Sequence, residues 1–388
     1  MIDKKGWEKK KLSEVGQVVT GNTPKTSDNS NYSSNDFCFF KPSDLRGNNI
    51  SLLSESENNI SESAFRNSRS LPIGSVLVTC IGTIGNVGVT TVVSTSNQQI
   101  NAIIPNNETD SRFLAYSIYS IKSYLNHIAN APVVPIINKT QFSSVEIYIP
   151  PLPIQHKIVS ELDTLSDIIS KMKQQLAQLD ILAQATFYDM FGNPVSNEKG
   201  WKVKPLNKIT KVGTGGTPSR KREQEFYNGS INWAKTTEVK GKYIFDTEER
   251  ITELALVESN CKVYPIGTIL LAMYGQGKTR GNVGFLKIEA ATNQACATIP
   301  PSEELIQVFL YELLKNSYEY LRGLARGGNQ ENLNLNIVGN IKIIIPPISL
   351  QSLFVNRIDV IEQQKTLINK SIDEVQHLFD YTMVRYFN

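Results

Sequence analysis

The sequence has little of what disulfide stapling or metal chemistry requires. Its four cysteines (Cys38, Cys80, Cys261 and Cys296) lie far apart and form no CxxC pair, and its three histidines have no ligand spacing. This argues against a disulfide framework and a zinc site, and favours a reducing compartment. The Pro-Pro pairs follow isoleucine rather than Asn or Asp, so no methyltransferase motif is present, and no nuclease-like carboxylate arrangement occurs. We expect a chain with no catalytic residue, cofactor or metal of its own.

Long apolar runs and strong charge of one sign are also missing. No stretch approaches the ~18 apolar residues of a membrane span, and residues 1–11 are polar and basic, unlike a signal peptide, so we expect a cytoplasmic protein. The net charge is only +3. Basic residues outnumber acidic ones 13 to 12 in 1–152 and 20 to 15 in 198–347, but acidic residues lead 5 to 3 in 153–197 and 5 to 4 in 348–388. That distribution suits two nucleic-acid-facing domains on a protein-facing scaffold.

What the sequence does contain is an internal repeat. The same motifs occur twice, in the same order and at offsets between 193 and 196. They are Gly6-Trp7 and Gly200-Trp201, TGNTP (20–24) and TGGTP (214–218), LPIGSVLV (71–78) and YPIGTILL (264–271), GNVG (85–88 and 281–284), Asn97-Gln98 and Asn293-Gln294, and IPP (149–151 and 345–347). So many ordered matches indicate a duplication.

Each half predicts the same mixture of strands and helices, so the fold class is α+β. Short β-branched runs with Gly and Pro punctuation (74–93 and 267–288) predict strands and turns. A helical pattern follows at 113–128 and 308–325, then a short strand at 145–150 and 340–346. Each half ends in a helix without internal Pro or Gly, over 154–191 and 350–387 and roughly 55 Å long. The predicted domains are 1–152 and 198–347, with 153–197 and 348–388 as helical segments.

The two long helices share one apolar register with coiled-coil spacing. Connectivity predicts that they pair antiparallel and join two pseudo-symmetric domains as a rigid rod. Lys365 replaces an apolar residue in this stripe, and we expect it to face the layer of Ile169 and fix the register. The expected helix-pair residues are Ile158, Leu162, Leu165, Ile169, Met172, Leu176, Leu179, Phe354, Ile358, Ile361, Ile368, Ile372, Val375 and Phe379.

One motif suggests an enzyme. AMYGQGKT (272–279) fits a permissive phosphate-binding loop after a strand-like run, but the residues that follow do not begin a helix, and the other half has no lysine there. A nucleotide-hydrolysing enzyme at Ala272–Thr279 therefore remains one alternative, and a purely structural coiled-coil adaptor remains another.

The ordered motifs resemble a known family. Trp7 with Leu12 and TGNTP, the LPIG-to-GNVG segment, Asn97-Gln98 and IPPLPIQHKIVSELD (149–163), each repeated in the second half, resemble the pattern of Type I restriction-modification specificity subunits. The resemblance covers essentially the whole chain, including FGNP (191–194). One departure is KPSDLRG (41–47), which becomes KTTEVKG (235–241), with Glu238 in place of Asp44.

The resemblance implies a non-catalytic subunit with two target-recognition domains, each reading one half of a split DNA sequence, and with helices that set the spacer. It implies double-stranded DNA, two modification subunits and, through them, restriction motor-nuclease subunits as partners, and no membrane. S-adenosylmethionine, ATP and Mg are expected in those other subunits only.

Side-chain chemistry selects the expected DNA contacts. Lys and Arg neutralise phosphates, Asn, Gln and Arg suit base edges, and glycine-rich turns let backbone approach DNA. The set is Thr20, Asn22, Thr23, Lys25, Lys41, Asp44, Arg46, Thr83, Asn86, Thr214, Thr217, Arg220, Lys221, Arg222, Lys235, Glu238, Lys240, Tyr274, Gln276, Lys278, Arg280 and Asn282. Structural alternatives stay open: TGNTP as a turn, Asn97-Gln98 as a partner of buried backbone, and 220–222 as a solvated loop.

Overall fold

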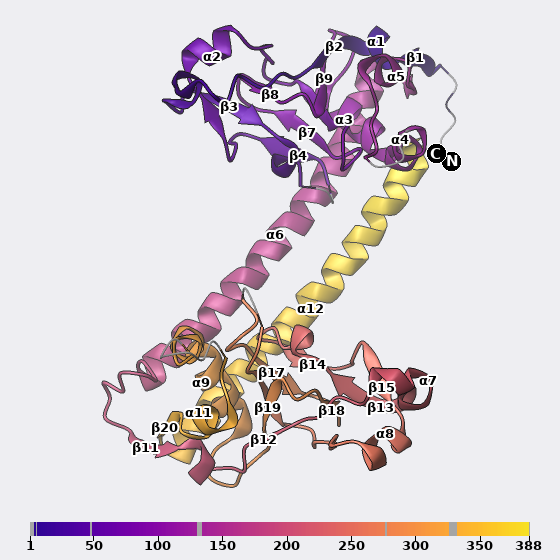
Figure 1. The fold of residues 1–388 in the computed structure, drawn as a ribbon. Helices are drawn as coiled ribbons and strands as arrows, with labels where there is room; N and C mark the ends of the chain where they lie inside the picture. Colours follow the sequence, from indigo (N-terminus) through magenta and orange to yellow (C-terminus); the bar gives the residue numbers. More distant parts are fainter. Residues whose placement is uncertain are drawn as a thin grey trace. The chain divides into compact units, whose positions relative to one another are not determined.

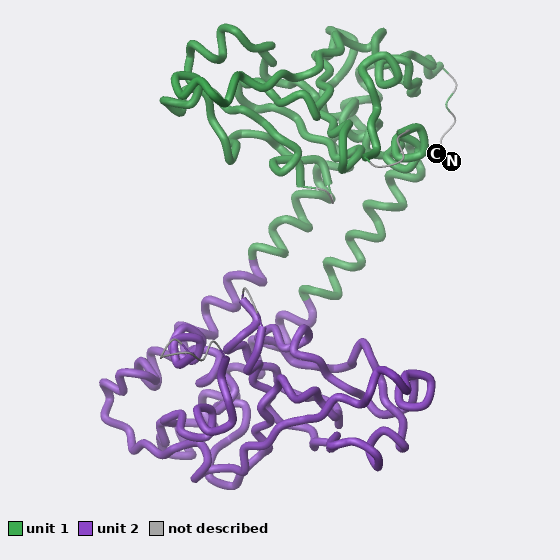
Figure 2. Tube along the Cα trace, in the orientation of Figure 1, with its two compact units in different colours: residues 1–174, 368–388 green, residues 175–367 purple. Residues whose placement is uncertain are grey.

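The chain folds into two compact α+β units. The computed structural model describes residues 4, 6–46, 49–129, 134–275, 278–325 and 332–387. Residues 1–174 and 368–388 form unit 1, and residues 175–367 form unit 2 (Figure 2). Each unit therefore combines one of the repeated halves with parts of both long helices.

The described residues of unit 1 form three sheets. The five-stranded sheet has the order β2-β9-β6-β7-β4, the three-stranded sheet the order β5-β3-β8, and β1 pairs with β10. The strands are β1 (Glu8–Lys11), β2 (Gly16–Thr20), β3 (Phe37–Phe40), β4 (Ser51–Leu53), β5 (Asn59–Ile60), β6 (Val76–Thr79), β7 (Val87–Thr90), β8 (Ser94–Ser96), β9 (Ile100–Pro105) and β10 (Glu146–Ile149). Short helices α1 (Leu12–Val15), α2 (Glu62–Arg66) and α5 (Lys139–Ser143) lie between strands. In Figure 1, β3 and α2 lie at the end of this unit that is remote from the long helices.

Unit 2 repeats this topology strand for strand. Its sheets have the orders β12-β19-β16-β17-β14, β15-β13-β18 and β11-β20, which are the unit 1 orders with ten added to every strand number. The strands are β11 (Lys202–Pro205), β12 (Gly213–Thr214), β13 (Tyr227–Ala234), β14 (Tyr243–Ile244), β15 (Glu249–Ile251), β16 (Ile269–Ala272), β17 (Val283–Leu286), β18 (Ala291–Thr292), β19 (Cys296–Ile299) and β20 (Lys342–Ile345). The helices α7 (Glu223–Phe226), α8 (Glu253–Glu258) and α11 (Leu335–Gly339) complete it. The predicted duplication and the α+β class are confirmed.

The centre of each five-stranded sheet is buried on both faces. Every residue of β6, β7, β16 and β17 is buried. This explains why these segments read as continuous apolar runs rather than as alternating patterns, because both faces of the strand meet packed side chains. The predicted strands at 145–150 and 340–346 are also present, as β10 and β20.

Each predicted helix after the sheet is broken into two. The pattern at 113–128 forms α3 (Ser111–Ser120) and α4 (Lys122–Ile128), and the pattern at 308–325 forms α9 (Gln307–Asn316) and α10 (Tyr318–Gly323). The predicted helical pattern is therefore present in both halves, divided between two helices in each. At Ile121 and Ser317 the backbone leaves helical geometry, with ψ of 17° and 10°. The bend lets Leu125 and Leu321 of the second segment be fully buried as well.

The long helices are α6 (Leu152–Phe191) and α12 (Ile348–Phe387), and each contributes to both units. In unit 1 the phenol of Tyr386, near the end of α12, donates a 2.6 Å hydrogen bond to Glu161, near the start of α6. In unit 2 the ammonium of Lys365 lies 2.8 Å from Asp180. Early residues of one helix thus meet late residues of the other, and the predicted antiparallel pairing is confirmed.

The apolar stripe of these helices is buried in part by other helices of each unit. Ile158, Leu162, Leu165, Ile169, Ile372, Val375 and Phe379 share one cluster with Phe113 and Tyr116 of α3, and Leu179, Phe354, Ile358 and Ile361 share another with Phe309 of α9. Met172, Leu176 and Ile368 are half-buried. The sequence predicted that this stripe is buried against the other helix alone, but the stripe also packs on α3 and α9. The ring centres of Tyr116 and Phe379 lie 6.2 Å apart, and those of Phe354 and Phe309 lie 6.3 Å apart.

Lys365 does not act at the layer expected for it. Its ammonium bonds Asp180 and Glu362, both at 2.8 Å, while Ile169 clusters with Ile372 and Val375. The reason is geometric. The two helices run in opposite directions, so residues at equivalent positions of the repeat do not in general lie at the same height along the pair. Lys365 therefore meets Asp180, eleven positions after Ile169 in α6.

No helix among the described residues is long and apolar enough to cross a membrane.

Candidate functional site

The TGNTP loop is held against the Asn97-Gln98 turn. A Cβ at Gly21 would lie 2.1 Å from the carbonyl oxygen of Asn97, so only glycine permits this approach. The Thr23 hydroxyl bonds the amide oxygen of Gln98, and the Thr20 hydroxyl donates to Asn101 at 2.6 Å. The Asn22 side chain accepts from the Arg69 amide at 3.1 Å.

The second half builds the same loop. Thr217 bonds Gln294, and Thr214 donates to the backbone oxygens of Gln294 and Cys296. A Cβ at Gly215 would lie 1.8 Å from the Thr292 oxygen. These contacts support the structural interpretation of TGNTP, and DNA contact by its side chains stays a prediction.

The second half has Glu238 where the first has Asp44, and both carboxylates accept the same backbone hydrogen bonds. The backbone N–H of Lys41 donates to Asp44 Oδ2 at 2.7 Å, and that of Lys235 donates to Glu238 Oε2, also at 2.7 Å. The other carboxylate oxygen accepts from the N–H of Glu57 at 2.9 Å in one half and of Glu248 at 3.0 Å in the other. Asp44 and Glu238 therefore fix the loops that carry Lys41 and Lys235.

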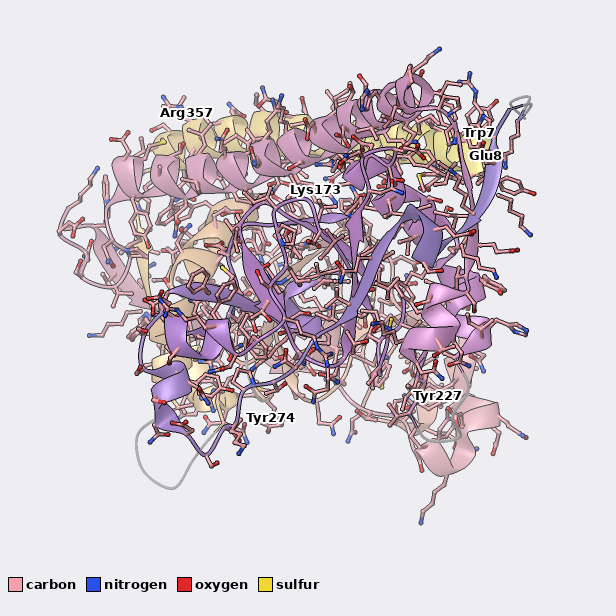
Figure 3. The ribbon with its side chains drawn as sticks, turned by 90° about the horizontal axis from the view of Figure 1, so that it is seen from above. Trp7, Glu8, Lys173, Tyr227, Tyr274 and Arg357 are labelled. Carbon is pink, nitrogen blue, oxygen red and sulfur yellow. The ribbon has the colours of Figure 1, made fainter. Side chains whose placement is uncertain are left out.

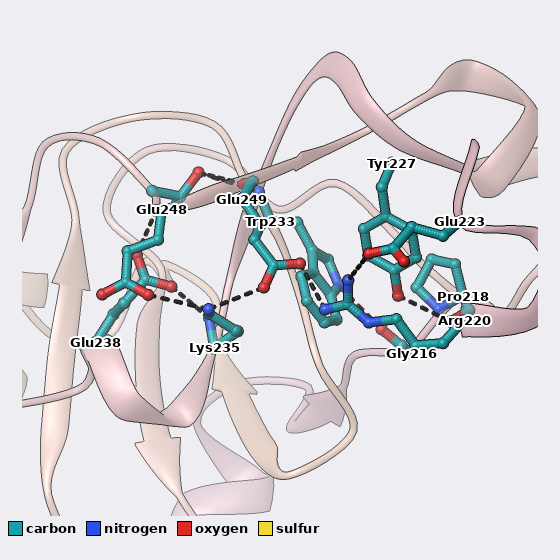
Figure 4. Close-up of polar contacts among 11 residues, drawn as sticks. Gly216, Pro218, Arg220, Glu223, Tyr227, Trp233, Lys235, Glu238, Glu248 and Glu249 are labelled. Atoms are coloured by element: carbon teal, nitrogen blue, oxygen red, sulfur yellow. Dashed lines mark hydrogen bonds and ion pairs between the residues drawn. The ribbon is translucent and has the colours of Figure 1, made fainter. Parts of the chain in front are cut away.

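The basic cluster of the second half is tied to carboxylates and aromatic rings (Figure 4). The guanidinium of Arg220 lies 3.9 Å from the ring centre of Tyr227 and bonds Glu249 at 2.5 Å and Glu223 at 3.0 Å. Glu249 also binds the ammonium of Lys235 at 2.9 Å, so it bridges two cations. Burial alone would raise the pKa of Glu249, but hydrogen bonds from Lys235 and Arg220 outweigh it and lower that pKa.

Other predicted cations are also paired. Arg222 bonds Glu225 at 2.6 Å as well as Glu258, and its guanidinium lies 4.2 Å from the Phe226 ring centre. Arg46 lies 3.2 Å from Glu57. Such pairs are exposed and exchangeable, but they compete with phosphate for the same donors.

The glycine-rich tips differ between the halves. Asn86 is buried, with its amide donating to the Leu45 oxygen at 2.9 Å and its oxygen accepting from Lys122 at 2.8 Å. That arrangement favours a structural role over base reading. Asn282 is half-exposed and donates to the Lys278 oxygen at 2.7 Å.

Several predicted contacts lie on the surface. The exposed residues are Thr23, Lys25, Arg46, Thr83, Thr217, Arg220, Lys221, Lys240, Tyr274 and Lys278. Arg280 is half-exposed, and Gln276 lies outside the described residues. Within unit 2, Tyr227 and Tyr274 occupy separate places, both away from Arg357 on α12 (Figure 3). The predicted contacts of unit 2 therefore form two groups, one near Arg220 and one at the β16–β17 tip, rather than a single patch.

The phosphate-loop alternative is not favoured. Beyond the tip, the next regular element is the strand β17, which pairs antiparallel with β16 from Ile269↔Phe285 onward. In the residues described from 278 to 286, no helix N-terminus follows to hold a phosphate, as that mechanism requires. Among the described residues, no group of three or more His, Cys, Asp or Glu side chains is arranged to hold a metal ion.

Two buried glutamines anchor the long helices, a role that sequence reasoning missed. Gln155 of α6 accepts from the Asp110 N–H at 2.8 Å and donates to the oxygens of Glu108 and Pro150 at 2.9 and 2.8 Å. Gln351 of α12 accepts from the Ile306 N–H at 2.9 Å and donates to the Pro346 oxygen at 2.8 Å. The signal was present, because both glutamines occupy one repeat position four residues after the Pro-Pro pair.

Known proteins are similar to this chain in sequence and in fold. The family model for the Type I restriction modification DNA specificity domain matches residues 4–180 and 198–377. The MjaIX Type I restriction enzyme specificity subunit of Methanocaldococcus jannaschii is 28% identical over 364 residues, covering 88% of this chain and 84% of that protein.

Two solved structures have a similar fold. The S subunit of a Type I system from M. genitalium matches with a TM-score of 0.60 and 14% identity, covering 98% of this chain and 96% of that one. A structure from work on complex assembly and conformational transition of the type I R-M system matches with a TM-score of 0.58 and 17% identity, covering 98% and 97%. Because the family model covers both halves, the chain belongs to the Type I restriction-modification DNA specificity domain family and carries two such domains.

Proposed function

We propose that this chain gives a Type I restriction-modification complex its DNA specificity, with each recognition domain reading one half of a split target. The observation that supports the proposal is that the same backbone framework occurs in both units but carries different side chains. The capping loops 41–44 and 235–238 have matching hydrogen bonds, whereas Arg220 and Glu249 have no charged counterparts in unit 1. Equal frames with different surfaces suit two unlike half-sites.

The helices supply the second part of the proposal. Because α6 and α12 each run unbroken for 40 residues and contribute to both units, they set the spacer between the half-sites, as subunit geometry sets half-site spacing in other DNA binders. On α12, Leu378, Tyr381 and Val384 remain exposed, at 51%, 66% and 53%. Exposed apolar side chains on a helix suit a protein partner.

The partners and cofactors follow from this role. Two modification subunits dock on the helical pair, and restriction subunits join through them. S-adenosylmethionine, ATP and Mg serve those subunits, and this chain contributes recognition of double-stranded DNA without a catalytic group.

A domain exchange tests the proposal. Residues 200–345 are replaced by the corresponding segment of a relative with another target, and methylated sites are mapped in cells that also express the modification subunit. We expect one half-site to change while the other half-site and the spacer stay the same. A change in both half-sites would exclude independent reading by the two domains.

A further inference from the structure

Arg220 rests on an aromatic ledge formed by β13. Its guanidinium carbon lies 3.9 Å from the ring centre of Tyr227 and 5.8 Å from that of Trp233. The two rings meet edge to face at 82°, and both are fixed from behind: the Tyr227 hydroxyl donates to the Pro218 oxygen at 2.8 Å and the indole N–H of Trp233 to the Gly216 oxygen at 3.0 Å. The ledge therefore holds the plane of the guanidinium in one orientation.

Carboxylates fix the rotation of that plane (Figure 4). Glu249 accepts from Nη2 of Arg220 at 2.5 Å, and it is itself held by Lys235 at 2.9 Å. Glu223 accepts from Nη1 at 3.0 Å, but the side chains of Arg220 and Glu223 are 47% and 61% exposed, so this second contact is readily exchanged. Of the five N–H donors of a guanidinium, the contacts that Arg220 makes with Glu223 and Glu249 use two.

The surroundings do not suit a phosphate grip. Beside Lys221, the cations Arg220, Arg222 and Lys235 pair with five carboxylates, namely Glu223, Glu225, Glu248, Glu249 and Glu258. A cluster with no net positive charge attracts the DNA backbone weakly. A single guanidinium with a fixed plane is instead suited to a planar pair of acceptors.

The other half of the chain has an equivalent tyrosine but no equivalent arginine. Tyr32 donates to the Pro24 oxygen at 2.9 Å, as Tyr227 does to Pro218, and Lys41 donates to Asn58 at 2.9 Å, as Lys235 does to Glu249. The residue two positions after the proline is Thr26 in place of Arg220. The contacts that both halves share hold the loops in place. The pair Arg220–Glu249 occurs in the second half only, so it is suited to distinguish the half-site of that domain from the other half-site.

We propose that Arg220, oriented by Glu249 on the Tyr227 ledge, reads a guanine in the half-site of the second recognition domain by paired hydrogen bonds to O6 and N7 in the major groove. The inference rests on the proposed function. Arg220 is the reading residue, and Glu249 is a positioning residue. An arginine placed in this way contacts guanine in preference to the other bases, because only guanine offers two acceptors side by side in that groove.

Methylation mapping of variants tests the inference in the assembled system. Arg220→Ala is expected to relax one G·C position of the second half-site, with a loss of discrimination of about 5- to 150-fold. Arg220→Lys keeps the positive charge but removes the paired N–H donors of the guanidinium, so it should relax the base preference at the same position. Glu249→Gln should relax it to a smaller extent. Lys221→Ala, which removes the neighbouring cation, is the matched control and should leave the base preference unchanged, whatever the level of methylation.

A binding measurement covers the case in which Arg220→Ala abolishes methylation. The purified complex is titrated with a duplex carrying 7-deazaguanine, which lacks the N7 acceptor, at that position. The wild-type complex should lose affinity, and the Arg220→Ala complex should not distinguish the two duplexes. Equal sensitivity of both complexes would overturn the inference.

Other outcomes separate the inference from the function on which it rests. A second half-site without a G·C pair, or an Arg220→Lys variant with unchanged base preference, would refute base reading by Arg220 alone. A wild-type complex that marks no split motif, or whose motif ignores exchange of residues 200–345, would instead refute the proposed function.

Discussion

Replacing the two anchoring glutamines by leucine should destabilise the two units unequally. Gln155→Leu leaves three backbone groups of unit 1 without their partner, the Asp110 N–H and the oxygens of Glu108 and Pro150. Gln351→Leu leaves two in unit 2, the Ile306 N–H and the Pro346 oxygen. At about 1 kcal/mol for each partly buried group, the expected costs are about 3 and about 2 kcal/mol.

Hydrogen exchange read by mass spectrometry measures these costs separately for each unit, which a single melting temperature of a two-unit protein does not. Faster exchange is expected around Asp110 in one variant and around Ile306 in the other. Gln174→Leu and Gln364→Leu, at exposed positions of the same helices, are the controls and should change little. If the anchoring variants exchanged like the controls, the idea that these glutamines tie the helices to the domains would be refuted.

Three further predictions concern unit 2. Phe354→Ala removes a buried ring that packs at 5.6 and 5.3 Å from Phe187 and Phe191, and calorimetry should show a loss of about 3–5 kcal/mol in the transition of this unit. Burial raises the pKa of Glu312 above its usual 4.5, so the folded state binds the proton more tightly than the unfolded state. The stability of the fold therefore falls as pH rises from about 4.5 through the raised pKa. Thermal melts across this range should show that Glu312→Gln stabilises the protein at about pH 7 and gives no gain near about pH 4. Glu238→Ala frees the N–H groups of Lys235 and Glu248 and should cost about 1–2 kcal/mol in urea unfolding, whereas Glu238→Asp, the residue type found at position 44, should cost less.

The duplication made much of the fold predictable from sequence. Motifs at a constant offset imply one topology built twice, and the strand orders of the two units agree throughout. The helices were predictable because 40 residues without internal glycine, and with proline only at Pro153 in the first turn, keep one apolar register. The break at Ile121 was not predictable, because an apolar pattern with helical spacing continues across it and only packing on the sheet selects the bend.

The site was less predictable than the fold. A list of Lys, Arg and Asn residues does not show which of them already have partners inside the protein. Asn86 and Arg220 bond other groups of the protein, whereas Lys240 lies exposed. The role of Glu249 depends on β15 lying beside β13, a pairing between residues distant from Arg220 in sequence. Gln155 and Gln351 were visible as a repeated residue, but the backbone N–H groups that they accept from, those of Asp110 and Ile306, lie 45 positions away in sequence.

The central claim is that two recognition domains on one chain read a split DNA sequence, and methylation mapping tests it most directly. DNA is sequenced for modified bases from cells that express this chain with its modification subunit, beside cells that express the modification subunit alone. The account predicts a new two-part motif with a fixed spacer and methylated adenines in both halves. An assembled complex that marks no motif, or an uninterrupted one, would contradict it.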